Sequence, residues 1–275
     1  MELYPSGCPD SLQTAQHQAS NNQVTVAVID TGISAERLEN PTILPGINLS
    51  GEGSMEDTAD SGKHGTTVAK IILSAAPNTR LVPIKLMNHR GSLQDRKKVE
   101  EAFAWILERR ESLGIQIVCA TFADFSHSTS DTEYRGDRLQ QQIAALREMN
   151  TATVAPAGNW YPENCRKSSQ GMAWPAIIRE VISVGEVEYK KDGFRLTRRT
   201  QRLHQTLGTG CQTTVFTTSS HLGNTSGAAA VVVGKLAALI HLYSLIEVDK
   251  VIADLLESQQ MINDETGFCW PVIDT

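Results

Sequence analysis

No two cysteines in this chain have a Cys-x-x-Cys spacing, and the five that occur are spread widely along its 275 residues. Because five cysteines cannot all pair, we expect free thiols in a reducing compartment rather than a disulfide framework. A structural zinc site is not expected either, since zinc ligands cluster more closely in sequence than these cysteines do.

We expect no secretion signal at the N-terminus. Residues 1–22 contain no apolar stretch behind a basic start, which is the pattern that such a signal requires. Together with the cysteines, this predicts a cytoplasmic protein.

An uninterrupted apolar span is also lacking. The nearest candidate, residues 227–246, carries Lys235 near its middle and His241 beyond it. A charge at bilayer depth costs about 2.5–3.5 kcal/mol on insertion scales. We therefore expect a helix buried in the core of a soluble protein, and no association with a membrane.

Positive charge is not in excess. The net charge is −6, which argues against a protein devoted to nucleic acid. One basic run stands out within residues 189–204, from Lys190 to Arg202. A solvated hairpin is the simplest interpretation. Docking of an acidic partner or precursor peptide and self-cleavage stay open, and nucleic acid is the least favoured partner.

The chain shows no internal repeat and no linker that would divide it. We expect one domain over residues 23–275, preceded by an extension over residues 1–22. The extension is expected either to be disordered or to lie across the functional cleft as an inhibitor, with Pro5 resisting cleavage.

Strand and helix patterns alternate along the chain. Strands are predicted over residues 24–29, 80–86, 115–122, 151–156 and 181–187, and helices over residues 64–75, 95–112, 137–149, 226–244 and 248–258. This alternation predicts a three-layer α/β/α fold with a mainly parallel central sheet. Pro83 is an unfavourable residue inside its predicted strand, because proline cannot donate to a ladder.

Two triplets raise the question of an acid protease. Asp30-Thr31-Gly32 ends the first predicted strand, and Asp60-Ser61-Gly62 follows 30 residues later. An aspartic dyad needs two carboxylates that share a proton, and each must come from its own β lobe. The intervening residues cannot build such a lobe. We interpret the second triplet as a turn and expect Asp60→Asn to have little effect.

Four polar residues lie within two residues of a glycine at predicted strand ends or helix starts: Asp30, His64, Asn159 and Ser226. Open α/β sheets bind ligands at the carboxyl ends of their parallel strands. The free N–H groups and positive dipole end of a helix N-terminus suit a serine whose attack creates an oxyanion. Each residue alone is typical of a cap or a turn, but their combination and order indicate a catalytic site.

The stretches VAVIDTGI, HGTTVAKI, APAGN and GNTSGAAAVVVGKLAAL resemble the Asp, His, Asn and Ser motifs of subtilisin-like serine proteases, in that family's chain order. The resemblance covers residues 22–245. It implies a serine endopeptidase in which Ser226 attacks the peptide carbonyl, His64 carries the proton and Asp30 orients His64. It further implies an oxyanion hole formed by Asn159 and the Ser226 N–H.

An esterase of the α/β-hydrolase type is the nearest rival with the same nucleophile. That fold needs Gly-x-Ser-x-Gly and a catalytic histidine that comes last in the chain. Here Asn224 occupies the first glycine position, and no histidine follows His241. The order of the motifs therefore disfavours an esterase.

The chain departs from the family at two places. Small residues, Gly227 to Ala230, follow Ser226 where the family usually has Met-Ala and then Pro-His. Residues 70–86 pass from helix to strand without an acidic insertion, whereas calcium needs six to eight oxygen ligands. We expect no calcium loop, no metal and no cofactor.

The resemblance also implies where a peptide or protein substrate binds. Residues 121–124 and 155–158 would form the two walls of a cleft in which the substrate adds as a strand. Five residues are therefore candidate substrate contacts: Phe122, Ala123, Asp124, Ala157 and Gly158. Asp124 would either favour a basic substrate residue or face solvent.

Two other functions stay open. The chain could be a catalytically impaired subtilase fold that binds peptides, because its sequence departs from the family after the serine. It could also be a dedicated maturation protease or macrocyclase for a precursor peptide. Water and an amine compete for the same acyl-enzyme, so the same triad serves hydrolysis and cyclisation.

Overall fold

The structure is a computed structural model that describes residues 23–161, 170–243, 247–257 and 259–273. The proposed N-terminal extension lies outside the described residues. The strands are β1 (Thr25–Asp30), β2 (Thr42–Ile43), β3 (Ile47–Asn48), β4 (Arg80–Lys85), β5 (Ile115–Ala120), β6 (Ala152–Pro156), β7 (Ile182–Lys190), β8 (Gly193–Leu196), β9 (Val215–Thr217), β10 (Gln260–Asn263) and β11 (Cys269–Val272). The helices are α2 (His64–Ala75), α3 (Lys97–Leu113), α4 (Arg138–Glu148), α6 (Asn224–Tyr243) and α7 (Val248–Glu257), with single 3₁₀ turns at Ala35–Arg37 and Thr132–Tyr134.

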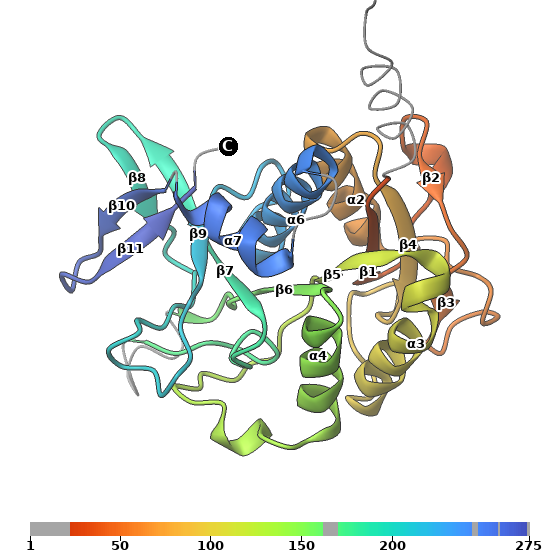
Figure 1. Cartoon of the computed structure of the whole chain (residues 1–275), viewed down its shortest axis with the longest axis horizontal. Helices are drawn as coiled ribbons and strands as arrows, with labels where there is room; N and C mark the ends of the chain where they lie inside the picture. Colours follow the sequence, from red (N-terminus) through yellow and green to blue (C-terminus); the bar gives the residue numbers. More distant parts are fainter. Residues whose placement is uncertain (1–22, 162–169, 244–246, 258, 274–275) are drawn as a thin grey trace, which may run out of the picture.

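The described strands form one sheet in the order β10-β11-β9-β7-β6-β5-β1-β4-β2, with β3 beside β4 and β8 beside β7 (Figure 1). The run from β9 to β4 is parallel throughout. Its strands read as continuous apolar runs because both faces of the sheet are covered. Parallel pairing brings the carboxyl ends of β1 and β6, and the residues that follow them, to one edge of the sheet.

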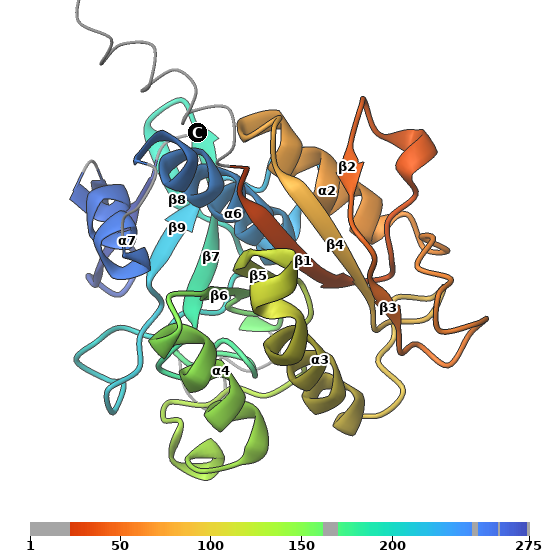
Figure 2. The ribbon, with the colours of Figure 1, turned by 45° about the vertical axis from the view of Figure 1, so that its right-hand side comes forward.

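Helices cover both faces of the sheet. Helices α2, α6 and α7 lie on one face, and α3 and α4 lie on the other (Figures 1 and 2). Helix α3, which overlaps the helix predicted over residues 95–112, buries a stripe of Val99, Phe103 and Ile106 at helical spacing. The predicted three-layer α/β/α class with a mainly parallel sheet is confirmed.

Helix α6 is largely buried because it packs on the sheet, mainly on β6 and β7, and has α2 and α7 beside it on the same face. Among the described residues it is the single helix long and apolar enough to cross a membrane, and 67% of its most apolar stretch is buried inside the molecule. A Cβ atom on Gly234 would lie 2.9 Å from the Ala75 Cβ atom of α2, so glycine permits the close contact. The helix thus occupies the core, as the sequence predicted.

Pro83 lies inside β4 without breaking it. Strand β2 pairs with the start of β4 and β3 pairs with its end. The Pro83 carbonyl faces Gly46, in the gap between those two short strands. The N and C=O groups of a strand residue point to the same side of the strand. The N–H that Pro83 lacks would therefore face this gap, where no edge strand pairs with β4.

The basic run divides into two parts. Strands β7 and β8 form a hairpin, and its exposed Lys190 and Arg195 pair with the neighbouring Glu188 and Asp192 at 2.6 and 3.0 Å. Arg202 is instead 2% exposed. The interpretation of the whole run as a solvated hairpin was therefore wrong for its C-terminal part.

The described cysteines are all free thiols. Cys119 and Cys211 are buried, and Cys269 is exposed. Cys8 and Cys165 lie outside the described residues. The expectation of free thiols agrees with the three cysteines that can be assessed.

Candidate active site

Asp30 is the last residue of β1 and is fully buried at the carboxyl edge of the sheet. Its Oδ1 accepts the Thr31 N–H at 2.6 Å, and its Oδ2 accepts the Thr121 hydroxyl. Gly32 follows with φ of +105°, and a Cβ atom there would lie 2.5 Å from the Thr58 carbonyl oxygen. Only glycine tolerates this turn, so the Asp-Thr-Gly triplet serves to end the strand with a fixed carboxylate.

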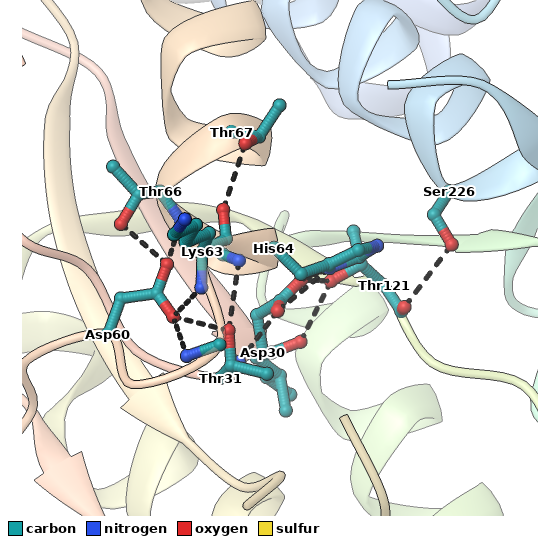
Figure 3. Close-up of polar contacts among 12 residues, drawn as sticks. Asp30, Thr31, Asp60, Lys63, His64, Thr66, Thr67, Thr121 and Ser226 are labelled. Atoms are coloured by element: carbon teal, nitrogen blue, oxygen red, sulfur yellow. Dashed lines mark hydrogen bonds and ion pairs between the residues drawn. The ribbon is translucent and has the colours of Figure 1, made fainter. Parts of the chain in front are cut away.

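His64 begins α2 and meets this carboxylate. Its Nδ1 lies 2.8 Å from Oδ2 and 2.9 Å from Oδ1 of Asp30 (Figure 3). Burial lowers the pKa of His64, but the hydrogen bond and charge of Asp30, with a contribution from Asp60, outweigh it and raise the pKa above 6.5. With Nδ1–H donated to the carboxylate, Nε2 is left as the proton acceptor.

Gly65 allows α2 to start this close to β1. A Cβ atom on Gly65 would lie 2.2 Å from the Gly32 carbonyl oxygen and 3.0 Å from the Asp30 Cβ atom. The glycine that follows the histidine is therefore a requirement of packing, and it sets the distance between the two catalytic candidates.

Asp60 does more than form a turn. Its Oδ1 accepts from the Thr31 hydroxyl at 2.7 Å and from the N–H groups of Gly62 and Lys63 at 2.8 Å. Its Oδ2 accepts from the Thr66 N–H at 2.8 Å and the Thr66 hydroxyl at 2.6 Å. Burial would raise the pKa of Asp60, but these hydrogen bonds outweigh it and the pKa lies below its ordinary value. Asp60 thus anchors the N-terminus of α2, and the interpretation as a simple turn was wrong.

Ser226 lies in the first turn of α6, near the end of the helix that carries unpaired N–H groups. Among the described residues, its hydroxyl donates to the Thr121 carbonyl oxygen at 3.4 Å and makes no hydrogen bond to His64 (Figure 3). Catalytic hydrogen bonds often tighten only when substrate binds. A Cβ atom on Gly227 would lie 2.3 Å from the Ser219 carbonyl oxygen, which explains the small residue after the serine.

Asn159 follows β6 and is tied to the helix that carries the serine. Its Oδ1 accepts from the Thr225 N–H at 3.0 Å and the Thr225 hydroxyl at 2.9 Å. With Oδ1 engaged, the Nδ2 group remains as a donor. Sequence reasoning missed Thr121 and Thr225, because their residue type does not distinguish them from other threonines.

A cavity of about 340 Å³ opens beside these groups, and His64, Asn159 and Ser226 all line it. Phe122 and Ala123 line it too, so the structure brings two of the predicted substrate contacts to the site. The cavity continues toward the loop of residues 87–91.

The other three predicted contacts do not line this cavity. Asp124 Oδ1 accepts from the Ser126 N–H at 2.9 Å and the Trp174 N–H at 3.1 Å, so this oxygen holds two segments of the protein together. Ala157 is fully buried, and its N–H and C=O pair with Val184 and Ala173. Gly158 is buried and does not line the cavity.

No group of three or more His, Cys, Asp or Glu side chains within the described ranges could hold a metal ion. The link from α2 to β4 is the four residues 76–79. That the protein needs no calcium or other cofactor stays a prediction.

The fold and the site geometry together define the class of the protein. A carboxylate that fixes a histidine through Nδ1, beside a serine at a helix N-terminus, is the arrangement of serine hydrolases. Residues 21–267 match the subtilase family, Peptidase S8. The chain therefore belongs to the subtilases, as the sequence motifs indicated, and this family supports a serine protease.

Relatives and solved structures agree with this assignment. Subtilisin DY of Bacillus licheniformis is 26% identical over 257 residues, which span 86% of this chain and 87% of that protein. The crystal structure of a lanthipeptide protease matches with a TM-score of 0.66 at 16% identity, over 96% of this chain and 89% of the other. Sphericase matches with a TM-score of 0.66 at 15% identity, over 88% and 87%. At such identities the two structural likenesses show the fold.

Proposed function

We propose that the protein is a serine endopeptidase that cleaves peptide bonds through an acyl-enzyme, with Asp30, His64 and Ser226 as its triad. The observation that carries the proposal is the 2.8 Å contact between His64 Nδ1 and the Asp30 carboxylate, at a cavity that Ser226 also lines. Membership of the subtilase family supports it.

In the proposed reaction, Ser226 Oγ attacks the peptide carbonyl carbon and its proton passes to His64 Nε2. The same proton then goes to the leaving amine, and water repeats the sequence on the acyl-enzyme. Asp30 remains ionised, and its charge stabilises the imidazolium that forms between the two transfers. The raised pKa of His64 agrees with this role.

The negative oxygen formed in each step would bind to Asn159 Nδ2 and the Ser226 N–H. Two hydrogen bonds from Thr225 already orient the Asn159 amide, so little reorganisation is needed during the reaction. In the related subtilisin, loss of this type of donor costs roughly 10²–10³ in kcat.

A fluorophosphonate probe tests the proposal, since it reacts only with an activated serine. Wild-type protein should be labelled and Ser226→Ala should not. Ser220→Ala, which removes an exposed serine from the preceding loop, should be labelled like the wild type. No labelling of a folded wild-type protein would instead support a catalytically impaired fold that binds peptides.

A second candidate function is the maturation or macrocyclisation of a precursor peptide. The structural likeness to a lanthipeptide protease favours it, because that protein shares the fold over nearly the whole chain. Mass spectrometry of the products from a candidate precursor distinguishes cyclisation from hydrolysis. Transfer of the acyl group to an amine gives a ring or a new amide, whereas hydrolysis adds the mass of one water.

We further propose that the enzyme acts in the cytoplasm and without a metal. The buried free thiols Cys119 and Cys211 support a reducing compartment. For the metal, full activity should persist after dialysis against a chelator. A loss of activity that calcium restores would contradict this part of the proposal.

A further inference from the structure

Among the described residues, the Gln201 side chain connects the two predicted cleft walls. Its backbone N–H donates to the Gly158 carbonyl oxygen at 2.9 Å, so it lies directly behind the second wall, residues 155–158. Its Nε2 donates to the Ser126 carbonyl oxygen and contacts His127 Nδ1, both at 2.9 Å. Ser126 and His127 follow the first wall, residues 121–124. The amide of Gln201 therefore spans from one wall to the other.

The Gln201 side chain leaves no room behind Gly158. A Cβ atom on Gly158 would lie 2.0 Å from Gln201 Oε1 and 2.9 Å from the Ala173 Cβ atom. Gln201 itself is fully buried, and its Oε1 accepts the Trp160 N–H at 3.4 Å. A buried amide whose donors and acceptor are all engaged holds one position. The Gln201 side chain thus forms a rigid base beneath the space between the walls.

A pair of aromatic rings joins the walls a second time. Phe125 comes directly after the first wall, and Trp160 comes two residues after the second. Their ring centroids are 4.5 Å apart at an interplanar angle of 56°, which is a favourable packing geometry. The Phe125 side chain is 76% exposed, so the pair lies at the surface, whereas Gln201 lies below.

The filled position behind Gly158 contrasts with the open cavity on the His64 side of the site. If the substrate adds as a strand between the two walls, as the family resemblance implies, the residue whose carbonyl oxygen meets Asn159 would place its side chain between them. The cavity beside Ser226 runs toward His89 and Arg90. On the side of the walls it is lined by Ala123 and Trp160, and neither Gly158 nor Gln201 lines it. The open space next to His64 therefore extends between the walls only as far as Ala123 and Trp160, and it ends before Gln201.

We propose that the site accepts only a small residue, glycine, alanine or serine, on the acyl side of the cleaved bond, with Gln201 and the Phe125–Trp160 pair setting the limit. The inference rests on the proposed peptidase function, because it describes the same Ser226 site. It names the substrate class as peptides with a small residue before the cleaved bond.

Diphenyl phosphonate probes test the proposal without knowledge of the natural substrate. Each probe carries one amino acid side chain at the position that would precede the cleaved bond and reacts irreversibly with the catalytic serine. Glycine and alanine probes should inactivate the wild type at least about tenfold faster than leucine, phenylalanine and lysine probes. Equal rates for large and small probes, or faster reaction with the large ones, would overturn the proposal.

Two variants test whether these residues set the limit. Gln201→Ala and Phe125→Ala should each raise the ratio of the phenylalanine rate to the alanine rate by about tenfold. Phe125→Ala removes an exposed ring, so its effect on folding should be small. The control is Tyr189→Ala, which removes another exposed ring, 71% accessible and packed on Phe194 of the β7–β8 hairpin, and should leave the ratio unchanged.

An unchanged ratio in both Gln201→Ala and Phe125→Ala would also overturn the proposal. The fluorophosphonate probe separates this failure from that of the proposed function. If Ser226 is labelled but the phosphonates inactivate the protein at the same rate whatever their side chain, the size limit alone is rejected. Absence of any labelling rejects the peptidase function and the size limit with it.

Discussion

At the scale of single residues, the Asp30 carboxylate is expected to act by orienting His64. Asp30→Asn should leave the fold intact, because the amide has the same shape and can still accept the Thr31 N–H bond. It should cut turnover by about 10⁴-fold, since an amide favours the wrong tautomer of the histidine. Peptide hydrolysis kinetics and thermal unfolding measure the two effects. Turnover within tenfold of the wild type would contradict the triad.

Asp60 is expected to matter for stability, contrary to what the sequence suggested. Its two oxygens accept five hydrogen bonds, three at Oδ1 and two at Oδ2. In Asp60→Asn, whichever oxygen becomes an NH₂ group leaves at least one backbone N–H without its acceptor and removes the charge that strengthens the other bonds. We expect a loss of about 2–4 kcal/mol in the free energy of unfolding, measured by urea titration.

The control for Asp60 is Asp57→Asn in the same loop. Asp57 is exposed and accepts a single hydrogen bond, from the Ala59 N–H at 3.2 Å, so this variant should unfold like the wild type. An Asp60→Asn protein as stable as Asp57→Asn would show that the hydrogen bonds to Asp60 contribute nothing.

The raised pKa of His64 predicts how activity depends on pH. His64 accepts a proton from Ser226 only when Nε2 is unprotonated, so kcat/KM should rise with pH and reach half its maximum above pH 6.5. The contribution of protonated His64 to the stability of the fold has the opposite dependence on pH. It is complete below pH 6.5 and is lost as the pH rises through the higher pKa of the folded state. A kcat/KM profile with its midpoint below pH 6.5 would contradict the assignment.

At the scale of elements, the sequence predicted the central helices and parallel strands well, because each is long and strongly patterned. It missed strands such as β2, β3 and β10, which have two to four residues. Strands this short are defined by the neighbour they pair with, and local pattern does not contain that information. Gln201 was missed for a similar reason, since a buried glutamine in a loop has no sequence signal.

The start of α2 depends on Gly65, and Gly65→Ala tests this. The new methyl group would lie 2.2 Å from the Gly32 carbonyl oxygen, so α2 must shift and carry His64 away from Asp30. We expect a lower melting temperature and a fall in kcat/KM of about 100-fold, the usual cost of a misplacement near 1 Å.

Gly234→Ala provides the comparison within another helix. Its methyl group would lie 2.9 Å from the Ala75 Cβ atom, at the contact between α6 and α2 and away from the triad. This variant should also lower the melting temperature but leave kcat/KM unchanged. If both variants lose activity alike, Gly65 has no special effect on the catalytic geometry.

At the scale of the whole molecule, Arg202 connects segments that are distant in the sequence. It donates to Asp264 at 3.2 Å and to Glu265 at 2.6 Å, in the turn between β10 and β11. Its guanidinium also lies 4.1 Å from the centre of the Tyr161 ring, two residues after Asn159. This link could not be predicted from the sequence, because the partners are 62 and 63 residues beyond Arg202.

Arg202→Met should therefore destabilise the protein and loosen the β10–β11 hairpin. The side chains of Arg202 and Asp264 are 2% and 0% exposed, and removal of one partner of a buried ion pair costs about 3–5 kcal/mol. Arg195→Met is the matched control, because Arg195 forms an exposed pair with Asp192 that should contribute about 0–1 kcal/mol. Urea unfolding measures the two losses, and amide hydrogen exchange locates them. We expect faster exchange in β10 and β11 for Arg202→Met, and equal stability of the two variants would show that the buried pair does not hold the hairpin to the sheet.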